Sequence, residues 1–264
     1  MMDIVLENVT AGYGFTPVLD SISLKISEGE RVLVAGTNGS GKTTLLRVIA
    51  RLLPFDGRVT YGTSDSGSIR RKELASVVSY MPQNGETYFD YTVEQTVMLG
   101  RYSHMTGLLA SPGSEDRKIA AEAMNRCGVY ELRYRALNEL SGGQLQRTFL
   151  ARAFAQQTPF MLLDEPENNL DVRHNSELTD YLNEWASGTT ELAGASVHNT
   201  VVAVMHDLGQ ASLCLERVIA LDKGIVAYDG SINDMVATGR ISDIFGFDVT
   251  GYKRRESKLW NLCK

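Results

Sequence analysis

The sequence predicts an α/β fold with a mixed sheet core, an N-terminal antiparallel β region and an inserted α-helical subdomain. At the N-terminus, short apolar runs alternate with turn residues, which is typical of strands. A long middle segment has the apolar spacing of helices, and strand-like runs separated by helical stretches return in the last third. Because 43% of the 264 residues are hydrophobic, the chain can bury the core of one such domain, residues 1–264.

The first third of the chain is predicted to contain strands and one helix. Strands are expected between Ile4 and Val34, and the last of them, Arg31–Ala35, leads into a glycine-rich loop. Lys42–Leu53 has leucine and isoleucine at helical spacing and stops at Pro54, so a helix should open directly after this loop.

The middle of the chain, from about residue 84 to 157, is interpreted as the inserted helical subdomain. Helices are expected at Thr92–Gly100, Glu115–Cys127 and Ser141–Gln157. The core would then be split into two stretches, about 1–83 and 158–238. We expect the remaining tail, 239–264, to pack on the core.

The last third is predicted to supply most of the parallel sheet. Strands are expected at Phe160–Asp164, Thr200–Met205 and Val218–Leu221, with helical stretches between them. Ser187–Asn199 is rich in Ser, Thr, Gly and Ala and breaks the pattern, so it predicts a flexible surface loop.

Composition excludes several classes of protein. No stretch approaches the roughly 18 apolar residues of a membrane span, and the N-terminus lacks the pattern of a signal peptide, so a soluble cytoplasmic chain is expected. Cys127, Cys214 and Cys263 are too widely spaced for a zinc site or disulfide framework, and reduced thiols are expected. A net charge of −6 argues against nucleic acid as a partner.

Gly36–Thr43 matches the pattern GxxxxGK[ST] where the predicted strand meets the predicted helix. Glycines without side chains let successive backbone N–H groups surround phosphate oxygens at the positive end of a helix. Lys42 would place a point charge at the β- and γ-phosphates, and the Thr43 hydroxyl would bind Mg²⁺. The residues predicted to bind the nucleotide here are Gly36, Asn38, Gly39, Ser40, Gly41, Lys42, Thr43 and Thr44.

Two carboxylates, Asp164 and Glu165, follow four apolar residues and should emerge at the carboxyl end of a buried strand. Open α/β sheets bind their ligands at this edge. Asp164 is predicted to hold Mg²⁺ through water, and Glu165 to orient or deprotonate the attacking water. Glu167 is interpreted as a non-catalytic neighbour.

His206 and Gln83 are further catalytic candidates, because each follows a strand-like apolar run. His206 ends the run from Val201 to Met205 and could hydrogen-bond the γ-phosphate. Gln83 follows Val77–Met81, and its amide could reach the metal or the attacking water.

The pentapeptide LSGGQ, Leu140–Gln144, lies about a hundred residues after the glycine loop and about twenty before the carboxylate pair. A helix that begins at Ser141 would offer unpaired N–H groups and its positive dipole end to a phosphate. With these motifs in this order, the chain resembles the ATPase subunits of ATP-binding cassette (ABC) transporters over essentially its whole length. It therefore resembles P-loop NTPases of the ABC class rather than kinases or GTPases.

The resemblance implies ATP and Mg²⁺ as cofactors and a second copy of the chain as partner. In this family two cassettes close head-to-tail, so the LSGGQ segment of one copy caps the γ-phosphate held by Lys42 of the other. Glu167 stands where the family usually has Thr, and Asn168-Asn169 replace the commoner Ser-Ala. By resemblance, further nucleotide contacts come from Tyr13 (on adenine), Ser141, Gly142, Gly143, Gln144 and Asp171, while Gln83 matches the Q-loop and His206 the switch histidine.

Gly100–His104, shortly after Thr92–Glu94, resembles ATPases that serve importers of iron–siderophore, haem and cobalamin type. This implies transmembrane permease subunits as partners, an extracytoplasmic substrate-binding protein as an indirect partner, and a location at the cytoplasmic face of the membrane. Tyr88, Phe89 and Tyr91 either line an apolar groove for a permease helix or simply pack within the helical subdomain. In such importers the binding protein and the permease choose the cargo, so no residue of this chain identifies it.

Other readings stay open at this point. The same catalytic motifs would suit the ATPase of an exporter or lipid-release system, or a soluble ABC protein of DNA repair or translation. Proteins of the second kind usually carry two cassettes or a long coiled-coil insertion, and neither is visible. A catalytically dead cassette should have lost Lys42, Glu165 or His206, and all three are present.

Overall fold

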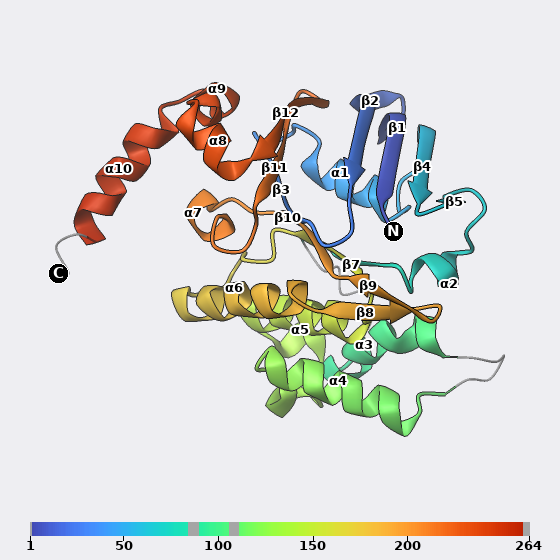
Figure 1. Cartoon of the computed structure of the whole chain (residues 1–264). Coiled ribbons are helices and arrows are strands. Elements are labelled where there is room, and N and C mark those ends of the chain that lie inside the picture. Colours follow the sequence, from blue (N-terminus) through green and yellow to red (C-terminus); the bar gives the residue numbers. More distant parts are fainter. Residues whose placement is uncertain (1, 84–89, 106–110, 261–264) are drawn as a thin grey trace.

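A six-stranded sheet forms the centre of the computed structural model, which describes residues 2–83, 90–105 and 111–260 (Figure 1). The strand order is β12-β11-β3-β10-β7-β6, and all neighbours are parallel except β11 and β12. The parallel strands therefore end at one common edge, where loops from distant parts of the sequence meet. The strands are β3 (Arg31–Gly36), β6 (Val78–Met81), β7 (Phe160–Asp164), β10 (Thr200–Val204), β11 (Arg217–Asp222) and β12 (Ile225–Ser231).

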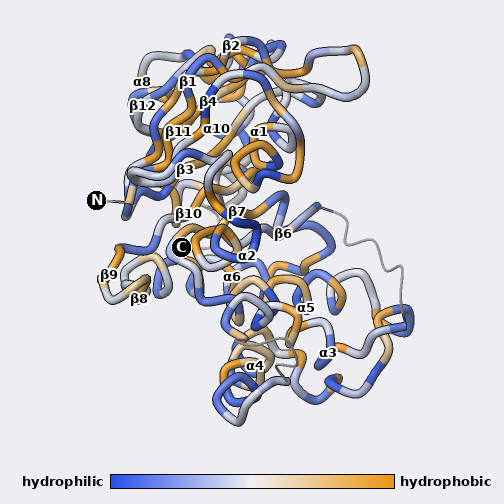
Figure 2. Tube along the Cα trace, turned by 90° about the vertical axis from the view of Figure 1, so that its right-hand side faces the viewer, coloured by the Kyte–Doolittle hydropathy of each residue, from blue (hydrophilic) through white to orange (hydrophobic). Residues whose placement is uncertain are grey.

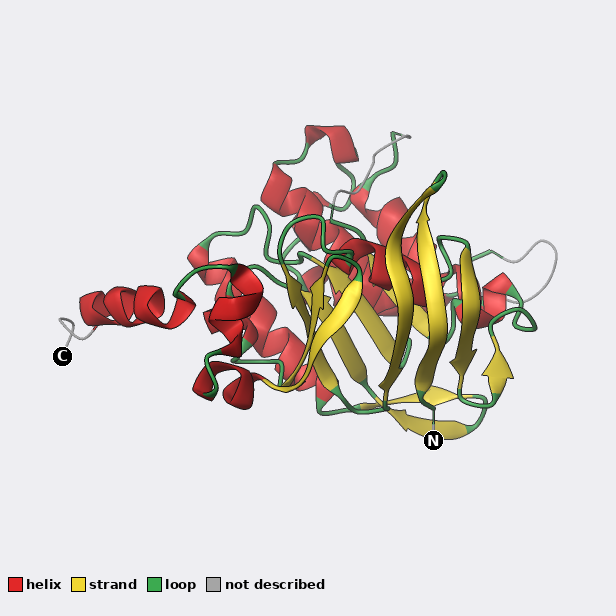
Figure 3. Ribbon diagram, turned by 90° about the horizontal axis from the view of Figure 1, so that it is seen from above, coloured by secondary structure: helices red, strands yellow, loops and turns green. Residues whose placement is uncertain are grey.

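A second, antiparallel sheet has the order β2-β1-β4-β5. Its first two strands form a long hairpin, which Figure 3 shows beside the central sheet. The expected N-terminal antiparallel β region is thus confirmed. The strands of this sheet are β1 (Ile4–Tyr13), β2 (Thr16–Ile26), β4 (Phe55–Tyr61) and β5 (Ser64–Asp65).

The helices predicted in the middle of the chain are present, and α3, α4 and α5 pack against one another on one side of the central sheet (Figure 1). Thr92 and Ser141 cap α3 and α5 through capping boxes with Gln95 and Gln144, which explains where these helices begin. The division into core and subdomain stays a prediction. The helices are α1 (Lys42–Ile49), α2 (Arg71–Leu74), α3 (Val93–Leu99), α4 (Ser114–Arg126), α5 (Gly142–Ala155), α6 (Val172–Ala186), α7 (Leu208–Ala211), α8 (Ile232–Ala237), α9 (Arg240–Phe245) and α10 (Val249–Trp260), with 3₁₀ turns η1 (Gly100–His104), η2 (Tyr130–Leu132) and η3 (Leu137–Glu139).

Buried apolar side chains form two clusters, one on each face of the central sheet. Leu33 on β3 belongs to the cluster that includes α3, α4 and α5, whereas its neighbours Val32 and Val34 belong to the cluster with α1 and the antiparallel sheet. This alternation follows from the two-residue repeat of a strand. Because both faces are covered, β3, β7, β10 and β11 are mainly apolar, and Figure 2 shows hydrophobic residues gathered along the sheet.

The helix expected at Lys42–Leu53 is shorter than predicted. It ends at Ile49, with Ala50 as its C-cap, and Arg51 has a φ of 53°. A residue in this left-handed conformation cannot continue a right-handed helix, so the helix ends four residues before the predicted end. Pro54 follows the turn rather than causing it.

The prediction of a flexible loop at Ser187–Asn199 is wrong. These residues form an antiparallel hairpin of β8 (Thr189–Leu192) and β9 (Ala195–His198) that pairs with neither large sheet. Its two-residue turn, Ala193-Gly194, has φ values of 52° and 82°, which match the twist of a hairpin. Side-chain bonds hold the hairpin to α6: Thr190 donates to the Asn199 side-chain oxygen (2.7 Å), and Asn199 donates to the Trp185 carbonyl oxygen (2.7 Å).

The C-terminal tail packs on the core through its first part, as expected. Ile241 on α9 and Val249 at the start of α10 are 4% and 5% exposed and join the larger apolar cluster. Lys253 in the middle of α10 contacts Asp207 (3.4 Å), and the end of the helix points away from the body of the molecule (Figure 1). Among the residues that the structure describes, no helix has both the length and the apolar character to cross a bilayer.

Cys127 and Cys214 should resist alkylation in the native protein. Both are free and buried, and burial raises the pKa of the Cys127 thiol to about 12 and that of Cys214 to about 11. At pH 8 only about one Cys127 side chain in ten thousand would be the reactive thiolate. Iodoacetamide followed by peptide mass spectrometry should therefore find both unlabelled, and both labelled after unfolding in urea. Rapid labelling of Cys127 in the folded chain would contradict the structure.

Candidate nucleotide site

The glycine loop connects β3 to α1 and leaves room only for glycine at two of its positions. A Cβ on Gly36 would lie 2.3 Å from the Leu221 carbonyl oxygen, and Gly36 has a φ of 142°. Gly41, at the N-cap of α1, has a φ of 106°, and a Cβ there would lie 2.7 Å from the Leu19 side chain. The loop therefore wraps tightly around the N-terminus of α1, where unpaired N–H groups can meet an anion.

Lys42, the first residue of α1, is turned back onto this loop. Its Nζ donates hydrogen bonds to the carbonyl oxygens of Gly36 (3.0 Å) and Thr37 (2.9 Å), and the residue is only 8% exposed. Burial lowers the pKa of the Lys42 ammonium, and the carboxylates of Glu165 and Asp164 oppose this shift. A buried cation held by carbonyl dipoles beside two acids is suited to exchange these partners for phosphate oxygens.

Asp164, at the end of β7, faces the start of α1. The Thr43 hydroxyl donates to its Oδ1 (3.1 Å) and the Tyr80 hydroxyl to its Oδ2 (3.2 Å). Asp164 is fully buried, and this burial raises the pKa of its carboxyl, while both hydrogen bonds act in the opposite direction. A hydroxyl and a carboxylate side by side are hard oxygen donors, so the residues present fit Mg²⁺.

Glu165, the next residue, is held by side chains from three segments far apart in the sequence. His206 Nε2 lies 2.7 Å from its Oε1, Gln83 Nε2 lies 2.5 Å from its Oε2, and Asn168 donates to the same Oε2. Glu165 is 7% exposed and has a φ of 54°. Both of its carboxylate oxygens are therefore bonded within the chain in this conformation.

The left-handed backbone of Glu165 is rare for a non-glycine residue and is fixed by bonds on both sides. Its N–H donates to the Val204 carbonyl oxygen at the end of β10 (3.0 Å), and its own carbonyl oxygen accepts from Gln146 Nε2 on α5 (2.9 Å). The helix that starts with the LSGGQ segment is thus tied to the main chain of the carboxylate pair.

A cavity of about 520 Å³ opens over these groups. Its volume is within the roughly 300–1,000 Å³ range of small-molecule sites. Tyr13, from the β1–β2 hairpin, forms one wall, is 47% exposed and accepts a hydrogen bond from Arg47 (3.1 Å). The cavity is lined by Tyr13, Val18, Asn38, Gly39, Gly41, Lys42, Thr43, Thr44, Gln83, Glu165 and His206.

Most predicted site residues thus come together in one chain, but the LSGGQ residues and Asp171 do not line this cavity. Ser141 and Gly142 lie exposed at the N-terminus of α5, next to the loop that contains Asn169, because a Cβ on Gly142 would lie 3.3 Å from the Asn169 side chain. Asp171 caps α6 by accepting from the His174 N–H (2.9 Å). Within this one chain, the LSGGQ segment and Asp171 therefore lie outside the wall of the cavity.

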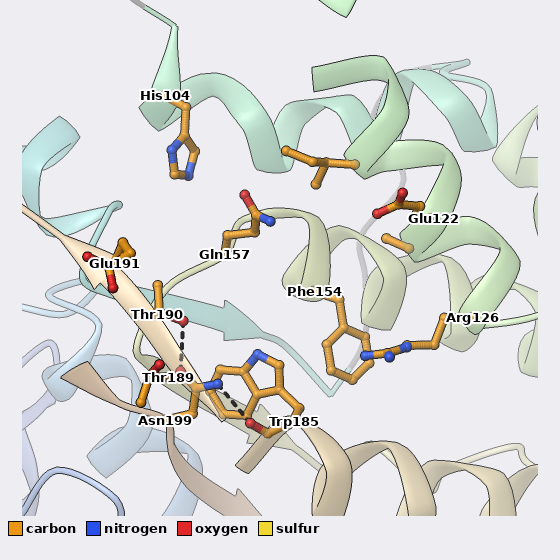
Figure 4. A pocket seen from close by; sticks show the side chains of 12 residues that line it. His104, Glu122, Arg126, Phe154, Gln157, Trp185, Thr189, Thr190, Glu191 and Asn199 are labelled. Atoms are coloured by element: carbon orange, nitrogen blue, oxygen red, sulfur yellow. Dashed lines mark hydrogen bonds between the residues drawn. The ribbon is translucent and has the colours of Figure 1, made fainter. Parts of the chain in front are cut away.

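A larger cavity, of about 710 Å³, contains none of the predicted site residues (Figure 4). It lies between α4, the ends of α5 and α6, and the β8–β9 hairpin, and Trp185 and Phe154 form its aromatic wall. Glu122 and Arg126 from α4 also line it, and Arg126 lies beside Phe154. It has none of the phosphate-binding features described above.

Sequence reasoning missed two residues of the nucleotide site. Tyr80, from the neighbouring strand β6, bonds Asp164, and Gln146 bonds the main chain of Glu165. Only the strand order, which pairs Tyr80 with Leu162 two residues before Asp164, brings Tyr80 there. No local pattern in the sequence marks these two residues as part of the site. Asn168 was singled out only by its resemblance to a family motif, and the structure shows it bonded to Glu165.

Comparison with known proteins agrees with this geometry. The sequence model of the family described as "ABC transporter" matches residues 19–168. The chain is 34% identical over 241 residues to the ferric enterobactin transport ATP-binding protein FepC of Escherichia coli (strain K12), covering 91% of this chain and 86% of FepC. It is 34% identical over 252 residues to the uncharacterized ABC transporter ATP-binding protein YvrA of Bacillus subtilis (strain 168), covering 95% of this chain but only 55% of YvrA.

A solved structure has the same fold. The dimeric structure of MJ0796, a bacterial ABC transporter cassette, superposes with a TM-score of 0.74 at 30% identity and covers 87% of this chain and 98% of that one. With the glycine loop, the carboxylate pair and the LSGGQ helix arranged as described, the chain belongs to the ABC transporter family, as one of the ATP-binding proteins that hydrolyse ATP to power transport.

Proposed function

We propose that this chain is the ATP-hydrolysing subunit of a membrane importer for an iron–siderophore, haem or cobalamin-type cargo. The observation that carries the catalytic part is the contact of Glu165 with both Gln83 and His206, directly beside the Lys42 loop. The import part is supported by the similarity to FepC and by the Gly100–His104 segment. This chain matches only 55% of YvrA, so nothing is inferred here from the activity of the whole YvrA protein.

Hydrolysis would depend on a change of partners around Glu165. Lys42 and the loop N–H groups would bind the phosphates of ATP, while Thr43 and Asp164 would hold Mg²⁺, which supplies positive charge to the phosphate oxygens. For its carboxylate to take a proton from the attacking water, Glu165 must release His206 or Gln83 from its oxygens. The released His206 could then hydrogen-bond the γ-phosphate. ATP binding would in this way be linked to the activation of the attacking water by Glu165.

The active unit would be a head-to-tail dimer of two copies. The exposed N-terminus of α5, with Ser141 as its cap, has unpaired N–H groups and a positive dipole end but no phosphate site of its own. The dimeric structure of MJ0796 supports this arrangement. Closure of the two copies around ATP would then drive the permease, and hydrolysis would reset it.

Permease subunits would dock on a groove beside α3 and would hold the chain at the cytoplasmic face of the membrane. Large apolar side chains are exposed there, with Tyr91 39%, Leu99 49% and Tyr102 68% exposed. Together with Met98 and Met105 they line a cavity of about 450 Å³, which suits an apolar helix face. A substrate-binding protein would act only through the permease. Tyr88 and Phe89, for which the sequence left open either this groove or packing within the helical subdomain, lie outside the described residues.

Capture of partners from native membranes tests this function. Tagged chain with Glu165→Gln, added with ATP to detergent-solubilised membranes, should retain a permease with many spans, identified by mass spectrometry. Leu99→Glu in the same background should lose the permease, because a charge cannot be buried against an apolar helix. Ile225→Glu, at another half-exposed apolar residue (51%), should keep it. Recovery of only soluble partners or nucleic acid would overturn the importer proposal while leaving the ATPase chemistry intact.

A further inference from the structure

Glu167 makes a contact with the switch region that its sequence position did not predict. It follows Glu165 by two residues on the loop after β7, and its Oε1 accepts a hydrogen bond from the backbone N–H of His206 at 2.6 Å. His206 comes two residues after the end of β10. The carboxylate therefore bridges the ends of two neighbouring parallel strands.

The burial of the other oxygen of the Glu167 carboxyl group is energetically unfavourable. Glu167 Oε2 is buried and has no hydrogen-bond partner in another residue that the structure describes. Burial raises the pKa of the Glu167 carboxyl, with Glu165 adding to this shift, while the hydrogen bonds from the backbone N–H groups of His206 and Glu167 itself oppose it. A buried, half-satisfied carboxyl is destabilising, so a shorter or apolar residue would be expected here unless the contact has a use.

Two contacts hold His206, one through its ring and one through its main chain. Its ring contacts Glu165 Oε1 (2.7 Å) and is about half exposed, whereas its main chain is bonded to Glu167. If the ring exchanges Glu165 for a phosphate, the contact to Glu165 must break, but the contact to Glu167 can persist. The main-chain bond would then act as the fixed point about which the ring turns.

We propose that Glu167 is a positioning residue for ATP hydrolysis, which fixes the main chain of His206 so that its ring can move between Glu165 and the γ-phosphate. This rests on the proposed function and adds a residue to it. Glu167 does not line the nucleotide cavity, so its effect on turnover would pass through His206.

The first test compares variants of the full chain. Glu167→Ala should lower kcat for ATP about 10-fold, as expected for a lost bond to a charged group, with the Kd for ATP changed less than about twofold. Glu167→Gln, which keeps an oxygen to accept the His206 N–H, should restore kcat to within about threefold of the parent. Glu177→Ala, which removes an acid paired with Arg173 on α6, is the matched control and should leave both constants unchanged.

The second test asks whether the effect passes through His206. In a His206→Ala background, adding Glu167→Ala should change kcat less than about twofold, because residues that act as one unit are not additive. A further 10-fold fall would overturn the proposal, as would a Glu167→Gln variant as impaired as Glu167→Ala. Both results would mean that Glu167 only stabilises the loop.

A third measurement does not depend on catalysis. Hydrogen exchange of the peptide that contains His206 should be faster in Glu167→Ala than in the parent and unchanged in Glu167→Gln, because only the first loses the acceptor. Unchanged exchange in both variants would refute the contact itself. If the parent chain hydrolyses no ATP even as a dimer, the proposed function fails, whereas the exchange result still tests the role of Glu167 at the switch.

Discussion

Replacing Glu165 with Gln should lower ATP turnover by at least about 100-fold while ATP binding remains within a few-fold of the parent. Gln has nearly the same shape and can still bond His206 and Asn168, so the cavity should keep its structure. Its amide, however, cannot accept a proton from the attacking water. Turnover is measured as phosphate release, and affinity by titration with ATP.

The same variant should accumulate as an ATP-bound dimer, because closure needs ATP but reopening needs hydrolysis. Size-exclusion chromatography with ATP should show a dimer for Glu165→Gln at concentrations where the parent is monomeric. Glu177→Gln, which changes an acid on α6 outside the site, is the control and should behave as the parent. Parent-like phosphate release by Glu165→Gln would show that another group acts on the water and that the position of Glu165 beside Gln83 and His206 has been misread.

Replacing Lys42 with Ala should weaken ATP binding by about 100-fold or more. In the structure its ammonium is buried against the Gly36 and Thr37 carbonyl oxygens, so it is already desolvated when the phosphates arrive. Charge-assisted bonds of this kind contribute about 1.5–3 kcal/mol each, and a tenfold change in affinity corresponds to about 1.4 kcal/mol. Titration calorimetry with ATP measures the change.

Folding has to be checked for this variant, because Lys42→Ala also leaves two carbonyl oxygens without their partner. A circular dichroism spectrum and thermal transition close to those of the parent would show that the loop and α1 remain. Lys25→Ala, at a lysine that is 54% exposed and paired with Asp3, is the control and should keep the parent's affinity. A folded Lys42→Ala chain that binds ATP as tightly as the parent would exclude the glycine loop as the phosphate site.

The sequence predicted the strands of the central sheet well, because β7, β10 and β11 are covered on both faces and their residues are almost all apolar. The first residues of the helices could also be predicted. The N-cap and the residue three positions later are local sequence features, as at Ser141 and Gln144. The Ser187–Asn199 hairpin could not be predicted in this way, because its two strands are short and mostly exposed and so lack a clear apolar repeat, and a bond to α6 helps to hold it.

By itself, then, the sequence determined where a glycine loop precedes a helix and where two acids follow a buried strand, because both features depend on local backbone geometry. Only the tertiary structure decided how these groups hold one another. Tyr80 on Asp164, Gln83 and Asn168 on Glu165, and Glu167 on His206 are all contacts made at the ends of parallel strands. Such contacts depend on strand order and register, and most of them join residues that are far apart in the chain, where no local pattern records the pairing.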